Sequence, residues 1–460
     1  MSLFGIIPAA SITKRRATYL SRLREARKRG GVLPSEAKAL ISECSLVLRR
    51  KKFLKGVLHL ASIIWKKAPT PQVLKLFMFS GLVWAAVVGP LSAVLILASV
   101  GATSQQIGVV TALCAVMAMV FAPVFGYIAD KVGSPRNVLS CCLLASAAFF
   151  GMVLFSQDFY VVAILLILEA MFRSGIVGLL DSHILSETKA IPGLQYGHMR
   201  MAGSFSFGSV SFFYSFVIND GGVMAIIPIS LGIAAAAIIW GLVVAKGRYE
   251  KSGNPDHLVR RAKSHLRRDA VNLLRNKAFV MLVFFTGLTA LAILPMFVFL
   301  IEYVTELGGL PGQVPLIQAM RCVVEIPVFI YISSKCKNTA PKKLLIIGAA
   351  LTVMYTIGIF LADSFMMLML SHALAGAPGF ILLLIGRLRY LNMVTPEAVR
   401  STSITLMVTG EIAIGSIIGN LLAGFVLYNF GTGHLAVFSF GSICAAMLLL
   451  WFMPRRVQAC

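Results

Sequence analysis

Twelve apolar stretches, each about twenty residues long, constrain this chain more than any other feature of its sequence. They run at about 73–99, 105–129, 137–156, 160–182, 197–218, 223–245, 278–302, 312–334, 343–361, 365–387, 398–427 and 433–453. A helix needs about twenty residues to cross the hydrocarbon core of a bilayer, and a backbone in lipid must satisfy its own hydrogen bonds. A β-barrel would show short alternating segments instead. The sequence therefore predicts an all-α membrane protein with twelve transmembrane helices.

The composition agrees with this class. Hydrophobic residues make up 58% of the chain and charged residues only 13%, against about 25% charged in soluble domains. The net charge of +24 would suggest nucleic acid in a soluble protein. Here the basic residues lie in the hydrophilic connections, which is typical of cytoplasmic loops under the positive-inside rule. No nucleic-acid partner is expected.

The stretches divide the chain into five parts. We expect a basic cytoplasmic amino-terminal extension over 1–72, a six-helix half over 73–245, a central basic cytoplasmic loop over 246–277, a second six-helix half over 278–453 and a short cytoplasmic tail over 454–460. The extension lacks the apolar core of a secretory signal. Three interpretations of it stay open: an organellar transit segment, a basic helix on anionic lipid, or a tail that fixes topology.

Charge asymmetry between connections predicts the orientation. The even-numbered connections are rich in Lys and Arg, whereas the odd-numbered ones carry acids such as Asp158, Asp220, Glu306 and Asp363. Basic loops stay in the cytoplasm. Both termini are therefore expected to be cytoplasmic, in the plasma membrane by default, with an organellar membrane as the alternative.

The connection between the second and third stretches carries a motif. Residues 126–136 read GYIADKVGSPR, which supplies Gly126, Asp130, Lys131, Gly133 and Arg136. This resembles the signature loop of the major facilitator superfamily, Gly-x-x-x-Asp-Arg/Lys-x-Gly-x-x-Arg. The resemblance implies the major facilitator fold, in which two six-helix halves form the bundle. An aspartate at a helix end can meet a basic group or helix N-terminus on a neighbouring bundle, as a gate requires; an ordinary polar turn is the alternative.

A narrower resemblance is to the lactose-permease-like branch, which includes nucleoside–proton symporters and aromatic-acid (phenylpropionate) permeases. It rests on Ile107-Gly108, Leu180-Asp181, Tyr196-Gly197 followed by Arg200, Gly203-Ser204 and Phe207-Gly208, Glu325-Ile326-Pro327 followed by Phe329, and His372. The chain departs from the branch at Ser371, where Leu is usual, and at Ala375-Gly376, where the branch has Phe-Gly. In that branch the acid of the eighth span helps to bind substrate, which implies the same role for Glu325.

Six ionisable residues fall inside the apolar stretches, where a charge costs roughly 2.5–3.5 kcal/mol. They are Glu169, Arg173, Arg321, Glu325, His372 and Glu411. Glu169 and Arg173 are four residues apart, as are Arg321 and Glu325, and this spacing puts each pair on one helix face. Each pair is either a self-neutralised helix contact or part of a substrate and proton pathway. His372 is either a core histidine or a member of that pathway.

Glu411 has no oppositely charged residue nearby in sequence, which predicts an interior site or a cross-helix pair. Protonation of Glu325 would be linked to solute loading as the two halves rock about a midplane cavity. His372 can titrate near neutral pH and share the proton. Asp130, Arg136, Asp181 and Arg200 fall at cytoplasmic helix ends, so we assign them to a cytoplasmic gate together with the motif residues Gly126, Lys131 and Gly133.

The sequence thus predicts a secondary active transporter for a small organic solute of the nucleoside, sugar or aromatic-acid class, coupled to protons. A solute-sensing receptor on the same fold is the alternative, and a lipid scramblase fits less well because of the midplane charges. The chain shows no nucleotide-binding loop, zinc spacing or nucleophile triad, so we expect no enzyme activity, cofactor or metal. The expected partners are the solute, protons and membrane lipid, and the expected state is a monomer.

Overall fold

The computed structural model describes residues 71–190, 196–243, 273–336, 339–396 and 399–454 of the 460-residue chain. The extension expected over 1–72 lies outside these residues except for its last two. The central loop expected over 246–277 lies outside them up to residue 272, and so does the tail of 454–460 after its first residue. Within the described residues the regular structure is helical throughout.

The first half of the described chain contains six spans. They are α3 (Pro71–Ala86) with α4 (Val88–Leu91) and α5 (Ala93–Ser99), then α6 (Ser104–Val132), α7 (Pro135–Met152) with η1 (Val153–Phe155), α8 (Phe159–Ala190), α9 (Tyr196–Gly221), and η2 (Val223–Ala225) with α10 (Ile226–Val243). The capping box at the start of α6 shows why a helix begins there. The hydroxyl of Thr103 accepts from the backbone N–H of Gln106, and the amide oxygen of Gln106 accepts from the backbone N–H of Thr103, so two orphan donors are satisfied.

The second half contains six more spans. They are α12 (Lys277–Val298) with α13 (Leu300–Glu306), α14 (Gln313–Lys335), α15 (Pro341–Phe360), α16 (Phe365–Leu370) with η3 (Ser371–Gly376) and α17 (Ala377–Val394), α18 (Arg400–Glu411) with η5 (Ile412–Ile418) and α19 (Gly419–Phe430), and α20 (Thr432–Phe452). Together the described residues hold twelve helices long and apolar enough to cross a membrane. The prediction of an all-α chain with twelve transmembrane helices is confirmed.

Two spans depart from regular α-helix in a way that the sequence did not predict. η3 and η5 are π-helical, so the tenth and eleventh spans each contain a segment near their middle in which the helix is wider than an α-helix. His372 is the second residue of η3, and Glu411 directly precedes η5. Single π-helical turns inside α-helices occur often at functional sites. Both spans are therefore distorted where they carry an ionisable residue.

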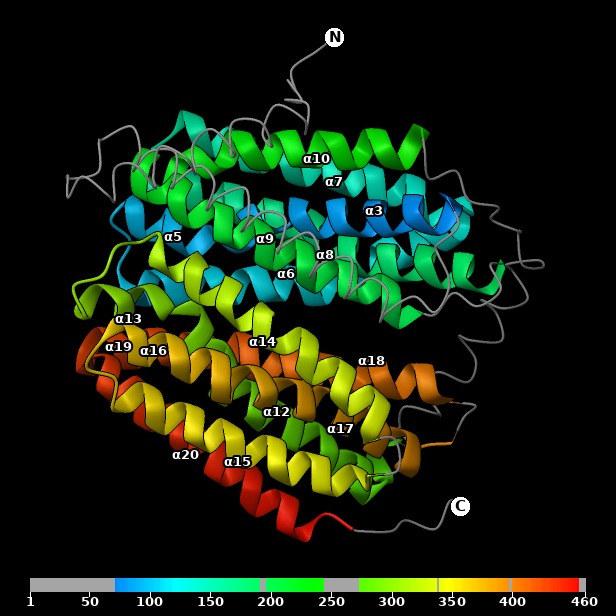
Figure 1. Cartoon of the computed structure of the whole chain (residues 1–460), viewed down its shortest axis with the longest axis vertical. Coiled ribbons are helices and arrows are strands. Elements are labelled where there is room, and N and C mark those ends of the chain that lie inside the picture. Colours follow the sequence, from blue (N-terminus) through cyan, green and yellow to red (C-terminus); the bar gives the residue numbers. More distant parts are fainter. Residues whose placement is uncertain (1–70, 191–195, 244–272, 337–338, 397–398, 455–460) are drawn as a thin grey trace, which may run out of the picture. The chain divides into compact units, whose positions relative to one another are not determined.

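The helices of residues 71–243 and those of residues 277–452 form two groups, which lie in the upper and lower parts of Figure 1. In the first group α8 packs on α6 and α7, and α3 packs on α9 and α10. In the second group α15 packs on α17 and α20, and α12 packs on α20 and η5. Between the groups, α9 packs on α14, and α6 packs on α19 and η5.

The two ends of the bundle differ in charge. We call the end with the odd-numbered connections, which carry Asp158, Asp220, Glu306 and Asp363, the acidic end; it is on the left in Figure 1. The opposite end, where α6 passes into α7 and α14 into α15, is the basic end. Several close contacts between the two groups lie toward the acidic end. The hydroxyl of Ser104 donates a 3.0 Å hydrogen bond to Glu302, which joins α6 to α13.

Glycines allow the two groups to approach closely there. A Cβ added at Gly108 of α6 would lie 2.5 Å from the backbone oxygen of Asn420 in α19, and one added at Gly312 before α14 would lie 2.4 Å from the backbone oxygen of Ser215 in α9. Larger residues would clash with backbone atoms at both places. The structure therefore has a conformation in which the halves are packed together toward the acidic end.

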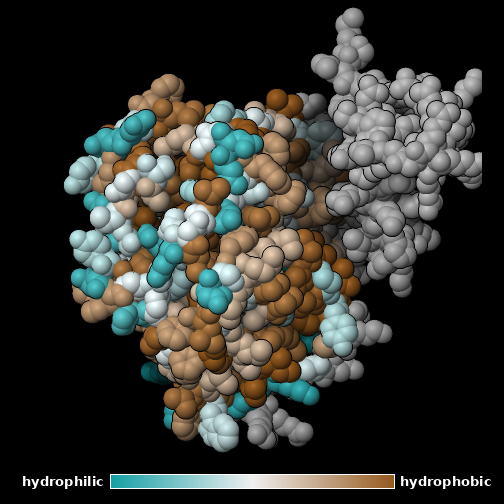
Figure 2. All heavy atoms as spheres, turned by 60° about the vertical axis from the view of Figure 1, so that its left-hand side comes forward, coloured by the Kyte–Doolittle hydropathy of each residue, from teal (hydrophilic) through white to brown (hydrophobic). Residues whose placement is uncertain are grey.

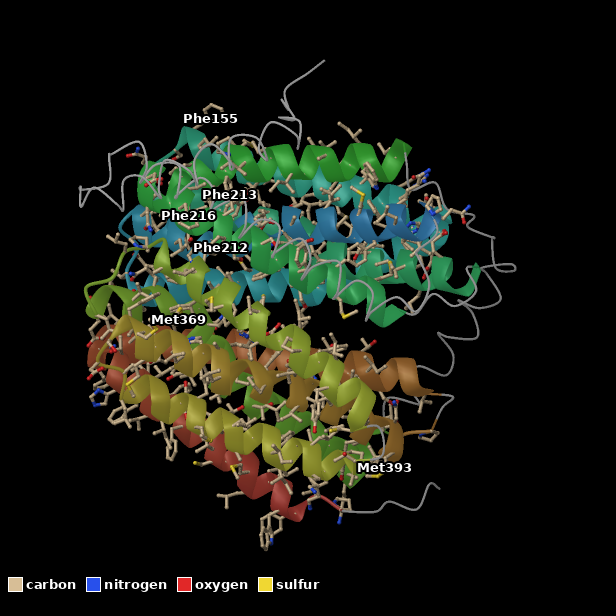
Figure 3. All side chains as sticks on the ribbon, viewed as in Figure 1. Phe155, Phe212, Phe213, Phe216, Met369 and Met393 are labelled. Atoms are coloured by element: carbon tan, nitrogen blue, oxygen red, sulfur yellow. The ribbon has the colours of Figure 1, made fainter. Side chains whose placement is uncertain are left out.

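The flanks of the bundle are apolar. Figure 2 shows large hydrophobic areas on one face of the molecule, with hydrophilic patches between them. Phe155, Phe212, Phe213 and Phe216 are exposed on the first group of helices (Figure 3). Exposed aromatic and aliphatic side chains on long apolar helices are what a surface in contact with lipid requires.

Candidate functional site

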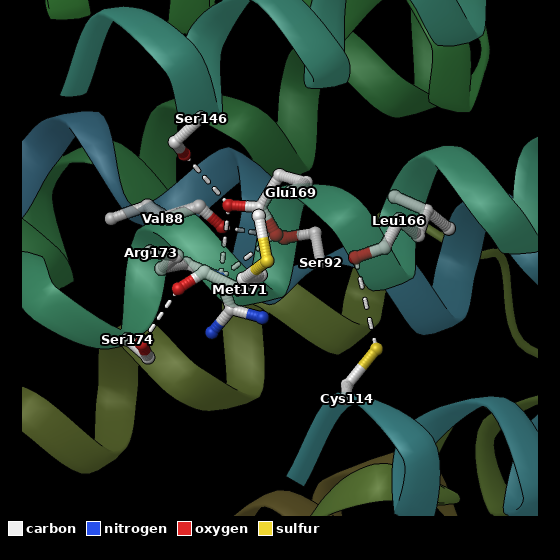
Figure 4. A network of polar contacts seen from close by, with 9 residues as sticks. All are labelled: Val88, Ser92, Cys114, Ser146, Leu166, Glu169, Met171, Arg173 and Ser174. Atoms are coloured by element: carbon white, nitrogen blue, oxygen red, sulfur yellow. Dashed lines mark hydrogen bonds and ion pairs between the residues drawn. The ribbon is translucent and has the colours of Figure 1, made fainter. Parts of the chain in front are cut away.

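The described residues bring the mid-span charges into three ion pairs. The first pair joins two residues of α8: Nε of Arg173 lies 3.0 Å from Oε2 of Glu169. Ser146 of α7 donates a 2.8 Å hydrogen bond to the other carboxylate oxygen (Figure 4). The Glu169 side chain is 0% exposed and that of Arg173 is 22% exposed. Both oxygens of Glu169 thus have protein partners, as a fully buried carboxylate needs.

The second pair lies on α14, where Nε of Arg321 is 2.9 Å from Oε1 of Glu325. The guanidinium of Arg321 also lies over two aromatic rings, with its carbon 4.8 Å from the ring centroid of Phe297 on α12 and 4.8 Å from that of Phe380 on α17. Stacking of this kind stabilises a desolvated cation. The two side chains keep 11% and 14% exposure, so Glu325 is less enclosed than Glu169.

His372 is buried between the ninth and tenth spans. Its Nε2 lies 3.0 Å from the hydroxyl of Tyr355 on α15, and its Nδ1 lies 3.0 Å from the carbonyl oxygen of Leu368. A carbonyl only accepts, so Nδ1 carries a proton, and in the neutral ring Nε2 accepts from the tyrosine hydroxyl. His372 and Tyr355 also line a small cavity with Arg321, Ile293, Thr352 and Gly376. The structure thus places His372 and Arg321 in the wall of one cavity, and Arg321 is in turn paired with Glu325.

The third pair crosses between spans. NH1 of Arg387 on α17 donates to Oε2 of Glu411 at the end of α18. The sequence predicted an interior site or a cross-helix partner for Glu411, and the structure has such a pair. The sequence does not single out Arg387, because this residue falls at the end of the apolar stretch 365–387, next to a basic connection. In the structure Arg387 lies inside α17, which continues to Val394.

The signature loop, residues 126–136, turns the chain from α6 into α7. Gly126, Asp130 and Lys131 lie in the last turns of α6, Gly133 caps this helix with a left-handed φ of 69°, and Arg136 is the second residue of α7. Asp130 and Lys131 are exposed, whereas Arg136 is half-buried.

The sequence predicts two more residues, Asp181 and Arg200, in the same gate. Asp181 is half-buried in α8. Arg200 belongs to α9, and its side chain lies outside the described residues. Only the backbone position of Arg200 can therefore be compared with the gate that the sequence predicts.

Glu187 belongs to the basic end as well, and the sequence did not single it out. It lies in the last turn of α8, beyond the apolar span Phe159–Leu185. Burial raises the pKa of the Glu187 carboxyl above its usual range, and the positive charge of Arg136 acts in the opposite direction. A partly buried acid therefore faces the arginine of the signature loop. Its position in the sequence, amid polar residues outside any motif, offers no signal for this contact.

Metal ligands form no cluster in the described part of the chain: no three His, Cys, Asp or Glu side chains are grouped as a metal ion would need. The ionisable groups instead pair with one another. Among the described residues, twelve helices long and apolar enough to cross a membrane, in two groups and with acid–base pairs deep in the spans, are the architecture of a multi-pass membrane protein.

The chain belongs to the MFS_1 like family, whose sequence profile matches residues 74–440. It is similar to the uncharacterized transporter YwbF of Bacillus subtilis (strain 168), with 23% identity over 348 residues that cover 75% of this chain and 81% of the relative. The resemblance to the major facilitator superfamily that the signature loop indicated is thereby confirmed. The chain is an integral membrane protein of the transporter class rather than an enzyme, and transport by this class implies a small-molecule substrate.

Solved structures agree on the fold. The crystal structure of the nucleoside transporter NupG superposes with a TM-score of 0.67 at 15% identity, over 84% of this chain and 98% of NupG. An auto-inhibited peptide transporter of the POT family superposes with a TM-score of 0.63 at 12% identity, over 85% of this chain and 98% of that one. At these identities the likeness establishes the transporter fold alone.

Proposed function

We propose that the protein is a proton-coupled secondary transporter that carries a small organic solute by alternating access. The observation that carries this proposal is the Arg321–Glu325 pair beside the cavity lined by Tyr355 and His372. Ionisable groups deep in membrane spans mark solute and proton pathways. The fold supplies two six-helix halves that can move about a central site.

Glu325 is the acid best placed to exchange a proton in this group. Its carboxylate accepts from Arg321 through one oxygen and keeps 14% exposure, whereas Glu169 uses both oxygens and has no exposure. Protonation of Glu325 would release Arg321 to contact the solute. Proton binding and solute binding would then favour each other, as symport requires.

His372 extends this site toward the ninth span. Its neutral form accepts from Tyr355 at Nε2. A proton added at Nε2 would force the tyrosine hydroxyl to turn and become an acceptor. The Tyr355–His372 pair therefore links any proton on His372 to a local rearrangement beside Arg321, and we assign the pair to the proton pathway.

The difference in charge between the two ends of the bundle supports an orientation as well. We infer that the basic end faces the cytoplasm, in agreement with the positive-inside rule, and that both termini lie on that side. Gly126, Asp130, Lys131, Gly133, Arg136, Asp181 and Arg200 then belong to the cytoplasmic gate. The plasma membrane is the proposed location.

Uptake into proteoliposomes tests the function. Nucleosides, sugars and aromatic acids are offered with and without an inward proton gradient; NupG, a nucleoside transporter of the same fold, supports including nucleosides. Gradient-driven accumulation of one class is expected. Glu325→Gln should abolish accumulation but keep solute counterflow, while Asp363→Asn, which neutralises an exposed acid on an odd-numbered connection, should change neither.

Two outcomes would overturn the proposal. Accumulation against a gradient by Glu325→Gln would remove Glu325 from the proton pathway. Solute binding by thermal shift without counterflow in the unaltered protein would favour the receptor interpretation instead.

A further inference from the structure

The Arg387–Glu411 pair has no role in the proton step described above, and it resembles a binding site in three respects. It lines a cavity of about 30 Å³ with the hydroxyl-bearing Thr286 and Thr289 and with apolar side chains of α12 and α17 that include Phe285, Ile293 and Phe380. A space of this size holds about one or two waters. Nε of Arg387 is buried and makes no hydrogen bond among the described residues, so the guanidinium keeps a donor for a ligand. Glu411 precedes the π-helical turn η5.

We propose that Arg387–Glu411 is a second proton-exchanging site, that the solute carries an anionic group such as a carboxylate which binds an arginine released by protonation, and that one proton enters for each negative charge of the solute. This inference rests on the proposed proton-coupled transport and names the chemical class of its substrate.

Exposure separates the three pairs. Glu411 keeps 20% exposure and Glu325 keeps 14%, whereas Glu169 has none. An acid that exchanges protons and gives up its arginine to a solute must be reachable by water. The acids of the two pairs in the second half keep accessible surface, whereas Glu169 on α8 keeps none.

The two exchangeable pairs are neighbours across one aromatic ring. Phe380 stacks on the guanidinium of Arg321 and also lines the cavity of Arg387 and Glu411. Ile293 lines both this cavity and the one that contains His372. Because the cavity of Arg387 and Glu411 holds only about one or two waters, a solute with one apolar body could contact both arginines only after Phe380 and the helices around it move apart. The apolar lining suits an organic acid with a hydrophobic body.

The net charge of each ion pair indicates the charge that the solute should carry. Each pair is neutral when the acid is ionised, and protonation of the acid leaves one uncompensated arginine charge in a poorly solvated site. An unpaired buried charge is unfavourable. An anionic group restores neutrality, so proton and anion each favour the binding of the other. A neutral nucleoside or sugar would leave the charge in place. The pair is neutral without proton and solute. With both bound, the site is neutral again only if the solute is an anion.

Transport currents test this inference. Proteoliposomes are adsorbed to a supported membrane, and benzoate, benzamide, uridine and glucose are compared under an inward proton gradient. Accumulation of benzoate well beyond that in protein-free liposomes, which the permeant protonated acid enters by itself, is expected without net current and unchanged when a potassium diffusion potential is imposed. Accumulation of benzamide, uridine or glucose with an inward positive current would overturn the inference and leave proton symport standing. If none of the four accumulates, the proposed function fails together with it.

Substitution of Glu411 tests the Arg387–Glu411 site separately from the other ion pairs. Glu411→Gln imitates the protonated acid, so benzoate should bind at pH 8 at least about tenfold more tightly than to the unaltered protein, and its pH dependence should flatten. Asp363→Asn should leave both unchanged. Unchanged affinity and pH dependence in Glu411→Gln would overturn the assignment. The double variant Arg387→Gln/Glu411→Gln has no charge at this site and should lose benzoate affinity, so it decides the matter if the single variant does not fold.

Discussion

Gly108 of α6 lies so close to Asn420 of α19 that a Cβ would be 2.5 Å from the asparagine backbone oxygen. The reverse contact is as close, because a Cβ at Gly424 would lie 2.7 Å from the backbone oxygen of Ser104. Neither helix can keep this distance with a larger residue. The closed arrangement of the two halves toward the acidic end therefore requires glycine at both positions.

We predict that Gly108→Ala opens this end, because the added methyl group must push α6 away from α19. In a cysteine-depleted background, spin labels at Ala102 and Gly433, which follow α5 and begin α20, should report longer distances. Gly441→Ala is the matched control, since a Cβ there meets nothing within 4 Å. An unchanged distance distribution in Gly108→Ala would show that the helices can relax without separating.

Glu169→Gln should mainly reduce stability. The substitution removes the countercharge of Arg173 and weakens the acceptor of Ser146 in a fully buried site, and loss of one partner of a buried pair costs about 3 kcal/mol or more. The melting temperature should fall by several degrees. The proton dependence of transport should be retained, which would distinguish this pair from Arg321–Glu325; a stable variant without proton coupling would instead place Glu169 in the pathway.

Tyr355→Phe removes the partner of Nε2 in His372. An unsatisfied buried nitrogen costs about 1–3 kcal/mol, so a modest loss of stability is expected. If the pair belongs to the proton pathway, the pH profile of uptake should shift as well. Tyr428→Phe alters an exposed tyrosine and should change neither. A stability loss with an unchanged pH profile would restrict His372 to a structural role.

Glu187 makes a prediction about pH. Because burial raises the pKa of its carboxyl in the folded state, the folded protein binds a proton more tightly than the unfolded chain. Stability from this group is therefore present below the unfolded pKa of about 4.5 and is lost as the pH rises through the raised folded pKa.

Replacement of Glu187 by Gln removes this dependence. Glu187→Gln should raise the melting temperature at neutral pH and have little effect near pH 4. Melting curves across this range check it, with Asp220→Asn at the exposed acidic end as the control. A lower melting temperature at neutral pH would mean that the attraction of Arg136 outweighs the effect of burial.

Local patterns explain how much of the fold the sequence could predict. Twelve apolar stretches predicted twelve spans because a bilayer imposes one length on every helix that crosses it. Four-residue spacing placed Arg173 beside Glu169 and Arg321 beside Glu325, and both pairs form at 3.0 and 2.9 Å. Helix geometry alone determines these contacts. What each pair does in transport stays a prediction.

Contacts between different helices could not be predicted from the sequence. Arg387 meets Glu411 across 24 residues, Tyr355 meets His372 across 17 residues, and Phe380 stacks on Arg321 from another span. No spacing rule connects these residues, and the π-helical turns that accompany two of them have no pattern in the sequence.

The sequence by itself determined the spans, the fold class and the two pairs within single helices, because hydrophobic length and helical periodicity are local properties. Only the tertiary structure decided which helices pack side by side. This packing determines the partner of Glu411, the partner of His372 and the position of Phe380 between Arg321 and the cavity of Arg387 and Glu411. These depend on how whole helices fit together, which is a property of all their side chains at once.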